Sequence, residues 1–280
     1  MIDLNDIQHF LIERPRALTA RYEFLTFRNP ESGCSWLAGI IEKVGTAQAV
    51  RAAGESEMRW VTVAFTWNGL RALGVDEASL ATFPEEFRQG MAARAEILGD
   101  TGANHPDNWL GGLASPDLHA IVILFARDVA ERERCVQEHQ KYASQFAGLE
   151  VLSVLDLEAT PPYDYPHEHF GYRDRISTPA IEGIDIETDP GSGPPIKAGE
   201  FFLGYPDEGG TVPKLPQPEI LSRNGSYLAY RRLQEHVGVF RDFLQQDMRL
   251  TVDHAIALVD DRLPDGLSQV TFAGARWPQK

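Results

Sequence analysis

The chain has 280 residues, of which 43% are hydrophobic and 24% are charged, and its formal net charge at pH 7 is -15. This composition is that of a globular protein with enough apolar surface to build a core. The acidic balance argues against nucleic-acid binding, which needs a basic surface, and against attachment to anionic membranes.

Location in the cell is predicted from what the sequence lacks. No apolar run approaches the roughly 20 residues of a membrane-spanning helix. The opening MIDLNDIQHF does not combine a basic segment with an apolar one, as an export signal does. Cys34 and Cys135 have no CxxC partner, so we expect free thiols in a reducing compartment. Together these features predict a cytoplasmic protein.

The first 157 residues alternate between strand-like and helix-like segments. Runs that are apolar, or rich in aromatic and β-branched residues, predict four strands at residues 20–27, 59–66, 118–126 and 149–157. Apolar spacing and end signals predict helices at residues 32–44, 67–74, 84–99 and 128–146. Asp128 is expected to cap the last helix, whereas residues 84–99 start with proline and end with glycine, as a complete helix does.

This order is β-α-β, a helical excursion, then β-α-β. It predicts the α+β class and a ferredoxin-like split βαβ fold, with a four-stranded antiparallel sheet and helices on one face. The other face of such a sheet needs cover from solvent-tolerant residues, a second sheet or a ligand.

Beyond residue 157 the pattern changes. Residues 158–200, which include DPGSGPP, predict an irregular connection. Further strands are predicted at 200–205, 225–234 and 268–274, and further helices at 237–248 and 252–261. These elements do not complete a second ferredoxin-like domain. We therefore expect a ferredoxin-like domain over 1–157, a connection over 158–200 and a partial second domain over 201–280.

The stretch YDYPHEHFGYRDRIS, residues 163–177, holds the candidate functional residues. His167 and His169 would leave one face of an extended strand and could bind zinc or iron, with nearby acids as oxygen ligands. Alternatively, one histidine packs against backbone and the other faces water. Asp174, between two arginines, either serves as a proton-transfer group or stabilises a turn. No GxGxxG, Walker A or GxSxG motif supports a nucleotide-binding or serine-hydrolase function.

Several long blocks resemble the dye-decolorizing peroxidases. They are VAFTWNGLRALG, FPEEFRQGMAARAEILGD, EHFGYRDRIS, KAGEFFLGYPDE and LSRNGSYLAYRRLQEHV. The resemblance runs from about residue 2 to about residue 255. It implies two ferredoxin-like halves packed sheet to sheet, of the dimeric α+β barrel type, with haem b in the second. It also implies an enzyme that reduces hydrogen peroxide and oxidises bulky aromatic electron donors.

The resemblance assigns roles within the central stretch. The family signature Gly-x-x-Asp-Gly reads Gly171-Tyr172-Arg173-Asp174-Arg175 here. Asp174 would be the distal proton mover, and the haem-pocket wall would be formed by Gly171, Arg175, Ile176 and Ser177. Arg175 departs from the signature, because glycine lets the backbone approach the porphyrin whereas an arginine side chain must intrude or turn away.

A second departure concerns the axial ligand. The family's proximal-histidine block, similar to Gly-Ala-His-x-Arg-Arg, has no counterpart in this sequence, which no longer follows the family after about residue 256. The expectation is a chain truncated before that block. Three functions remain open: a haem peroxidase, a non-catalytic remnant with weak haem-binding or interaction properties, and a metal-binding protein using His167 and His169. Unpaired strand edges further predict a homo-oligomer that forms through an exposed sheet.

Overall fold

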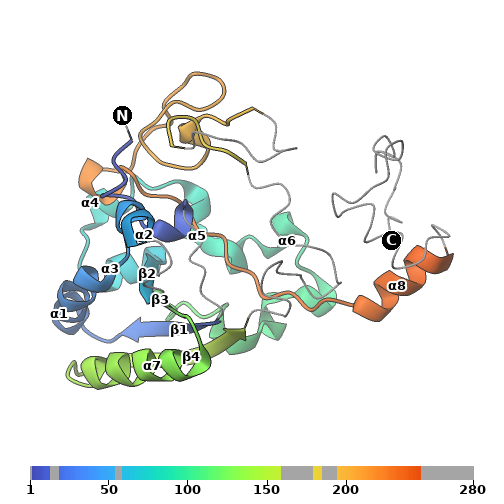
Figure 1. Ribbon diagram of the computed structural model, residues 1–280, viewed down its shortest axis with the longest axis horizontal. Helices are drawn as coiled ribbons and strands as arrows, with labels where there is room; N and C mark the ends of the chain where they lie inside the picture. The colour runs from blue at the N-terminus through green and yellow to red at the C-terminus, as the bar shows by residue number, and fades with distance from the viewer. Residues whose placement is uncertain (1, 13–18, 54–58, 159–178, 185–193, 247–280) are drawn as a thin grey trace. The chain divides into compact units, whose positions relative to one another are not determined.

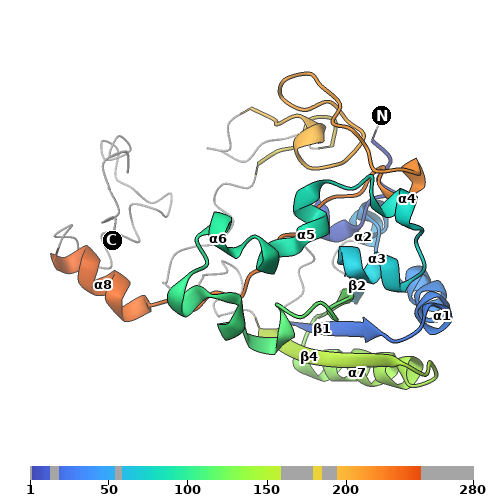
Figure 2. The same ribbon diagram turned by 180° about the vertical axis from the view of Figure 1, so that it is seen from behind.

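The computed structural model describes residues 2–12, 19–53, 59–158, 179–184 and 194–246 (Figures 1 and 2). The chain forms two compact units. The first comprises residues 1–158, 181–186 and 196–230, and the second comprises residues 159–180, 187–195 and 231–280. The described part of the second unit contains helix α8, Val237–Gln246, which confirms the predicted helix there.

The first unit is built on one antiparallel sheet with the strand order β2-β3-β1-β4. All four strands predicted within the first 157 residues are confirmed: β1 is Thr19–Phe27, β2 is Trp60–Phe65, β3 is Ala120–Ala126 and β4 is Leu149–Glu158. The two central strands, β1 and β3, are buried along most of their length. The order and the flanking helices make this a ferredoxin-like α+β fold.

Two helices cover one face of the sheet: α1, Pro30–Ile40, and α7, Val129–Ala143, which runs along the sheet in Figure 1. The core between them contains Trp36, Leu25 and Val122, all fully buried. Each large apolar side chain buried in this way stabilises the fold by roughly 1.5–3 kcal/mol. The sheet is therefore held mainly by this helix-covered face.

Side-chain caps fix where these helices begin. Asp128 Oδ1 accepts a hydrogen bond from the Glu131 backbone N–H at 2.9 Å, so the predicted cap of α7 is confirmed. Asn29 Oδ1 accepts one from the Ser32 backbone N–H at 2.8 Å at the start of α1. Both caps satisfy backbone donors that the first turn of a helix leaves free.

The helical excursion between β2 and β3 is more broken than the sequence predicts. Its helices are α3, Trp67–Ala72; α4, Glu77–Leu80; α5, Glu85–Ala93; and α6, Ala95–Leu98. The prediction of one helix over 84–99 is wrong, because Gly90 has φ 71° and ψ 175°, which no helical residue adopts. Glycine reaches this conformation without the steric cost that a Cβ would add.

The remaining elements are short. Helix α2 spans Ala47–Ala53. Single 3₁₀ turns occupy His9–Leu11, Ile41–Lys43, Gly102–Asn104, Pro106–Asn108, Leu110–Gly112, Ala198–Glu200 and Glu219–Leu221. No helix within the described ranges combines the length and the apolar character needed to cross a membrane.

The second face of the sheet carries its own apolar cluster, centred on Ala20, Phe24, Ile121 and Ile123. Loop residues pack against it; the ring centroid of Tyr230, for example, lies 5.3 Å from that of Phe24. This face is therefore covered in part by a distant segment of the same unit.

That packing explains why two predicted strands are wrong. Residues 200–205 form a turn in which the Phe201 and Phe202 backbone N–H groups donate to Ala198 O, and Phe202 is buried in a cluster with Ile7 and Ile181. Residues 225–234 have no ladder partner in the described part of the chain. Aromatic residues in both segments serve as anchors for loops and not as strand residues.

The two edges of the sheet differ. Along β2, the Gly45 N–H donates to Val61 O at 3.1 Å, and the Gln8 side chain bonds both the N–H of Val63, at 3.0 Å, and its carbonyl, at 2.9 Å. Across the residues that the structure describes, no strand pairs with the outer edge of β4. Val151, Val154 and Leu157 of β4 are 43%, 48% and 42% exposed. Within the described residues, the β2 edge is therefore covered, whereas the β4 edge, called the open β4 edge below, has no paired strand.

Candidate functional site

The candidate residues that the sequence predicts lie outside the described residues. They are His167, His169, Gly171, Asp174, Arg175, Ile176 and Ser177, all within residues 159–178. Their grouping into a site stays a prediction. Across the described ranges, no group of three or more His, Cys, Asp or Glu side chains is placed to hold a metal ion.

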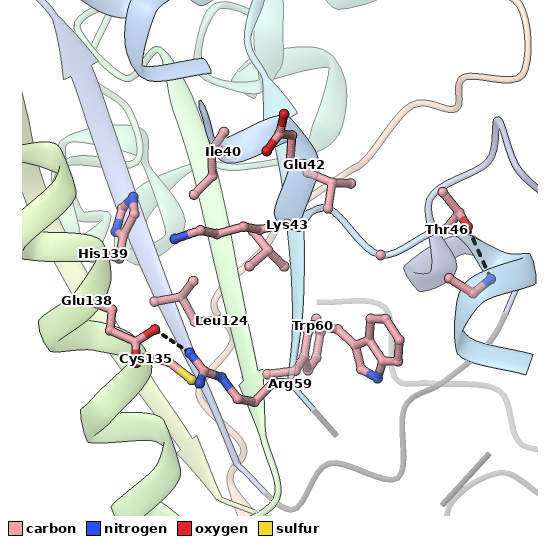
Figure 3. A pocket seen from close by; sticks show the side chains of 15 residues that line it. Ile40, Glu42, Lys43, Thr46, Arg59, Trp60, Leu124, Cys135, Glu138 and His139 are labelled. Atoms are coloured by element: carbon pink, nitrogen blue, oxygen red, sulfur yellow. Dashed lines mark hydrogen bonds and ion pairs between the residues drawn. The ribbon is translucent and has the colours of Figure 1, made fainter. Parts of the chain in front are cut away.

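The first unit contains a cleft of about 430 Å³ on the helix-covered side of the sheet, between the end of α1 and α7 (Figure 3). It forms because α1 ends at Ile40 and a 3₁₀ turn follows. The chain then runs beside the edge of β2, where Val44 forms a parallel bridge with Val61. This turn moves the backbone away from α7 and leaves the ends of β2 and β3 uncovered.

A buried hydrogen-bonded chain of three side chains borders the cleft. The Trp36 indole N–H donates to His139 Nε2 at 3.2 Å, and His139 Nδ1 lies 2.6 Å from Glu23 Oε2. An acceptor role for Nε2 requires the ring proton to be on Nδ1, so His139 is the neutral tautomer that donates to Glu23. Glu23 is fully buried, and its second oxygen, Oε1, has no hydrogen-bond partner among the described residues.

These contacts limit what His139 can do chemically. Both of its ring nitrogens are engaged, one by Trp36 and one by Glu23. A metal ligand or a general base needs a ring nitrogen with a free lone pair. The triad therefore joins α1, β1 and α7 and leaves no nitrogen for ligation.

Cys135 lies one helical turn before His139 and also lines the cleft. Burial raises the pKa of the Cys135 thiol, and the neighbouring Arg59 opposes that effect only in part. Because the thiolate is the reactive form of cysteine, this thiol is not activated as a nucleophile. Both cysteines are free, as predicted.

The polar rim of the cleft contains Arg59, Glu138 and Lys43 (Figure 3). The guanidinium of Arg59 forms an ion pair with the Glu138 carboxylate, and the hydrogen bond between them raises the pKa of Arg59. The Lys43 ammonium lies 5.7 Å from the centroid of the Tyr142 ring. A paired Arg59 and Glu138, an ammonium and a thiol whose pKa burial raises make an arrangement suited to binding a ligand.

Sequence reasoning missed this cleft. One usable signal was Glu23, an acid in the middle of the aromatic and apolar strand ARYEFLTF. A buried acid needs a partner, and His139 is one of two polar side chains, with Arg132, on the buried face of α7. The pairing of residues 116 positions apart could not be read from the sequence alone.

Comparisons with known proteins match the first unit to a described domain. Residues 21–159 match the model of the DyP dimeric alpha+beta barrel domain. The chain is 28% identical over 257 residues to Peroxidase 2 of Mycetinis scorodonius. The aligned region covers 91% of this chain and 48% of that protein. It is 26% identical over 246 residues to a dye-decolorizing peroxidase of Mycena epipterygia, covering 87% of this chain and 44% of the relative.

A solved structure agrees with these sequence matches. An ancestral D-type dye decolorizing peroxidase superposes with a TM-score of 0.75 at 26% identity, covering 92% of this chain and 56% of that chain. The chain thus spans about half the length of the proteins it matches.

Proposed function

The chain belongs to the dye-decolorizing peroxidase family, and on this premise we propose that it takes part in reducing hydrogen peroxide and oxidising bulky aromatic electron donors. The observation that carries the proposal is the agreement of three findings on one family: the matched domain over residues 21–159, the named peroxidases among the relatives, and the shared fold. Because the chain spans about half the length of these relatives, the activity of the whole enzyme is itself part of the proposal.

Within the proposal, Asp174 moves a proton of hydrogen peroxide. Gly171, Arg175, Ile176 and Ser177 would line the haem pocket beside it. A carboxyl group can do this work if it lies within hydrogen-bond reach of the peroxide. Arg175, in place of the family's glycine, would add a cation next to Asp174 and favour its ionised form.

The cofactor proposed is haem b, which supplies the redox chemistry with peroxide when bound. The described residues of the cleft do not fit it, because both nitrogens of His139 are already hydrogen-bonded. His119 is no better placed, since its Nδ1 accepts the Phe27 backbone N–H at 2.9 Å and its other nitrogen must then carry the ring proton. The haem pocket is instead proposed for the stretch around Asp174, which lies outside the described ranges.

Two further parts of the proposal concern organisation. The boundaries near residues 157 and 200, with a partial second domain over 201–280, stay a prediction; residues 196–230 are part of the first compact unit. We also infer self-association through the sheet; the open β4 edge and its exposed valines and leucine support this.

A second candidate function is that of an interaction protein that binds haem weakly or not at all. The open β4 edge favours it, because an unpaired strand is a surface on which another chain can add. A metal-binding function through His167 and His169 is the third candidate.

The experiment is to express the chain with a haem precursor and record its absorption spectrum. A sharp Soret band unlike that of free haem, and peroxide turnover that falls at least 100-fold in Asp174→Asn with the band unchanged, are expected for the peroxidase. A spectrum of free haem would instead support the interaction protein. Zinc or iron retained without porphyrin, and lost in His167→Ala, would support the metal-binding protein.

A further inference from the structure

The cleft beside α7 has the form of a small-molecule site. Its volume of about 430 Å³ falls in the range of roughly 300–1,000 Å³ that is usual for ligand pockets. Its apolar wall is made by Ile40 of α1, Val61 of β2 and Leu124 of β3, together with Val44 from the segment after the 3₁₀ turn. Three of these four side chains are therefore placed by regular elements of the fold.

Among the described residues that line the cleft, one cation, Lys43, forms no ion pair. Arg59 and Glu138 neutralise each other through their ion pair, and His139 is neutral by its hydrogen-bond pattern. Within the described ranges, no carboxylate lies within 4.0 Å of the Lys43 ammonium, whose only aromatic contact is the ring of Tyr142. Figure 3 shows the Lys43 side chain extending toward His139 and the Glu42 carboxylate pointing away from it.

The balance of charge decides the class of ligand. An ammonium that no carboxylate contacts among the described residues, beside an apolar wall, matches a molecule with one negative charge and an apolar body. A phosphate dianion would bring more charge than Lys43 alone can offset, and a neutral molecule would gain no charge-assisted hydrogen bond from the ammonium.

We propose that this cleft binds a small monocarboxylate with an aromatic or branched aliphatic body. The carboxylate accepts hydrogen bonds from Lys43 Nζ, and the body lies over Val61 and Leu124. This site is independent of haem and of the proposed peroxidase activity, so it can be tested in the chain as it stands.

The two cysteines allow ligand binding to be measured, with Cys135 as the reporter and Cys34 as the control. Cys135 lines the cleft and is buried, whereas Cys34 is exposed and does not line it. A bound ligand should slow alkylation of Cys135 by iodoacetamide and leave the rate at Cys34 unchanged. Mass spectrometry of the two cysteine peptides over time measures both rates in the same sample.

Three probes separate the possible ligand classes: benzoate, the neutral benzamide of nearly the same shape, and inorganic phosphate. Benzoate is expected to protect Cys135 at a concentration about ten-fold below that of benzamide, because a hydrogen bond to a charged group contributes that much selectivity. Phosphate should give no protection. In Lys43→Met, the difference between benzoate and benzamide should disappear. It should persist in Lys141→Met, which removes an exposed lysine of α7 that does not line the cleft.

Isothermal titration calorimetry with the same probes gives a readout that does not rely on thiol reactivity. The proposal is overturned if calorimetry detects no benzoate binding up to millimolar concentration. It is equally overturned if Lys43→Met binds benzoate as tightly as the unaltered chain, or if phosphate competes as well as benzoate.

Discussion

His139 Nδ1 and Glu23 Oε2 lie 2.6 Å apart in the interior of the first unit, and they join α7 to β1. Both residues are almost fully buried, at 3% and 0% exposure. Trp36 holds the other ring nitrogen of His139. Each group therefore depends on the other for this hydrogen bond, because water cannot reach the buried pair to replace either partner.

This pair leads to a double-mutant prediction. His139→Leu leaves both the Glu23 carboxyl group and the Trp36 indole N–H buried without a partner, and it should lower the free energy of unfolding by about 3–5 kcal/mol. The double variant Glu23→Leu/His139→Leu removes the unpaired carboxyl group but not the unpaired indole N–H, and it should recover part of that loss. Urea unfolding followed by tryptophan fluorescence measures both. A double variant less stable than His139→Leu would contradict the view that the unpaired group causes the loss.

The pKa of Asp156 predicts sensitivity to acid. Its hydrogen bonds with Arg21, both 2.6 Å long, hold the pKa of this carboxyl below its ordinary value. A carboxyl whose pKa is lower in the folded state adds stability above its unfolded pKa, and this stability is lost as pH falls through the folded value. The Tm should therefore fall below about pH 4.

The matched variants are Asp156→Asn and Glu42→Gln. Asp156→Asn should lower the Tm at pH 7 and approach the unaltered chain near pH 2. Glu42, which is exposed and has no ion pair within the described residues, should give a curve parallel to that of the unaltered chain. Equal Tm differences for Asp156→Asn at both pH values would argue against the ion pair as the source of the acid sensitivity.

Thr66 is predicted to hold the start of α3. Its hydroxyl accepts the Gly69 backbone N–H at 3.0 Å and donates to Leu118 O at 2.6 Å. Thr66→Ala should cost about 1–2 kcal/mol of unfolding free energy, as loss of a cap does. Thr66→Ser keeps the oxygen and should cost less than half as much. If the two variants are equally unstable in urea, the methyl group and not the hydroxyl carries the effect.

The open β4 edge predicts self-association through this strand. Val154→Lys places a charge on it, which opposes pairing with another strand. Sedimentation velocity should show a shift toward monomer relative to the unaltered chain at equal concentration. Val129→Lys, on α7 and similarly exposed at 44%, should leave the distribution unchanged. A monomeric unaltered chain across the accessible concentration range would remove the basis of this prediction.

Local patterns in the sequence predicted most of the first unit. The four strands, the helices that contain Trp36 and Cys135, and the cap at Asp128 all follow from spacing and end signals that act over a few residues. The order of these elements then left few topologies, because consecutive elements tend to pack together.

Two of the errors came from packing between distant residues, whereas the break at Gly90 is local. The pattern around Phe202 predicts a strand, but Phe202 is buried in a cluster with Ile7 and Ile181. Tyr230 likewise packs on Phe24 instead of joining a ladder. Aromatic residues favour strands and loop anchors alike, and only the tertiary fold separates the two.

The candidate site shows the same limit. The carboxylate of Glu23, the imidazole of His139 and the ammonium of Lys43 belong to three elements that the sheet brings together. None of them is part of a recognisable motif. The residues that resemble a motif, around Asp174, lie outside the described ranges.

The difference between the two sheet edges limits how many copies of the chain can associate through the sheet. Gly45 and Gln8 bond the outer backbone groups of Val61 and Val63 in β2, which opposes addition of a further strand on that side. If two copies joined through β4 about a twofold axis, each would pair the one strand edge that has no partner in the described sheet. Addition would then stop at a pair, and open-ended stacking into fibres would be blocked by geometry alone.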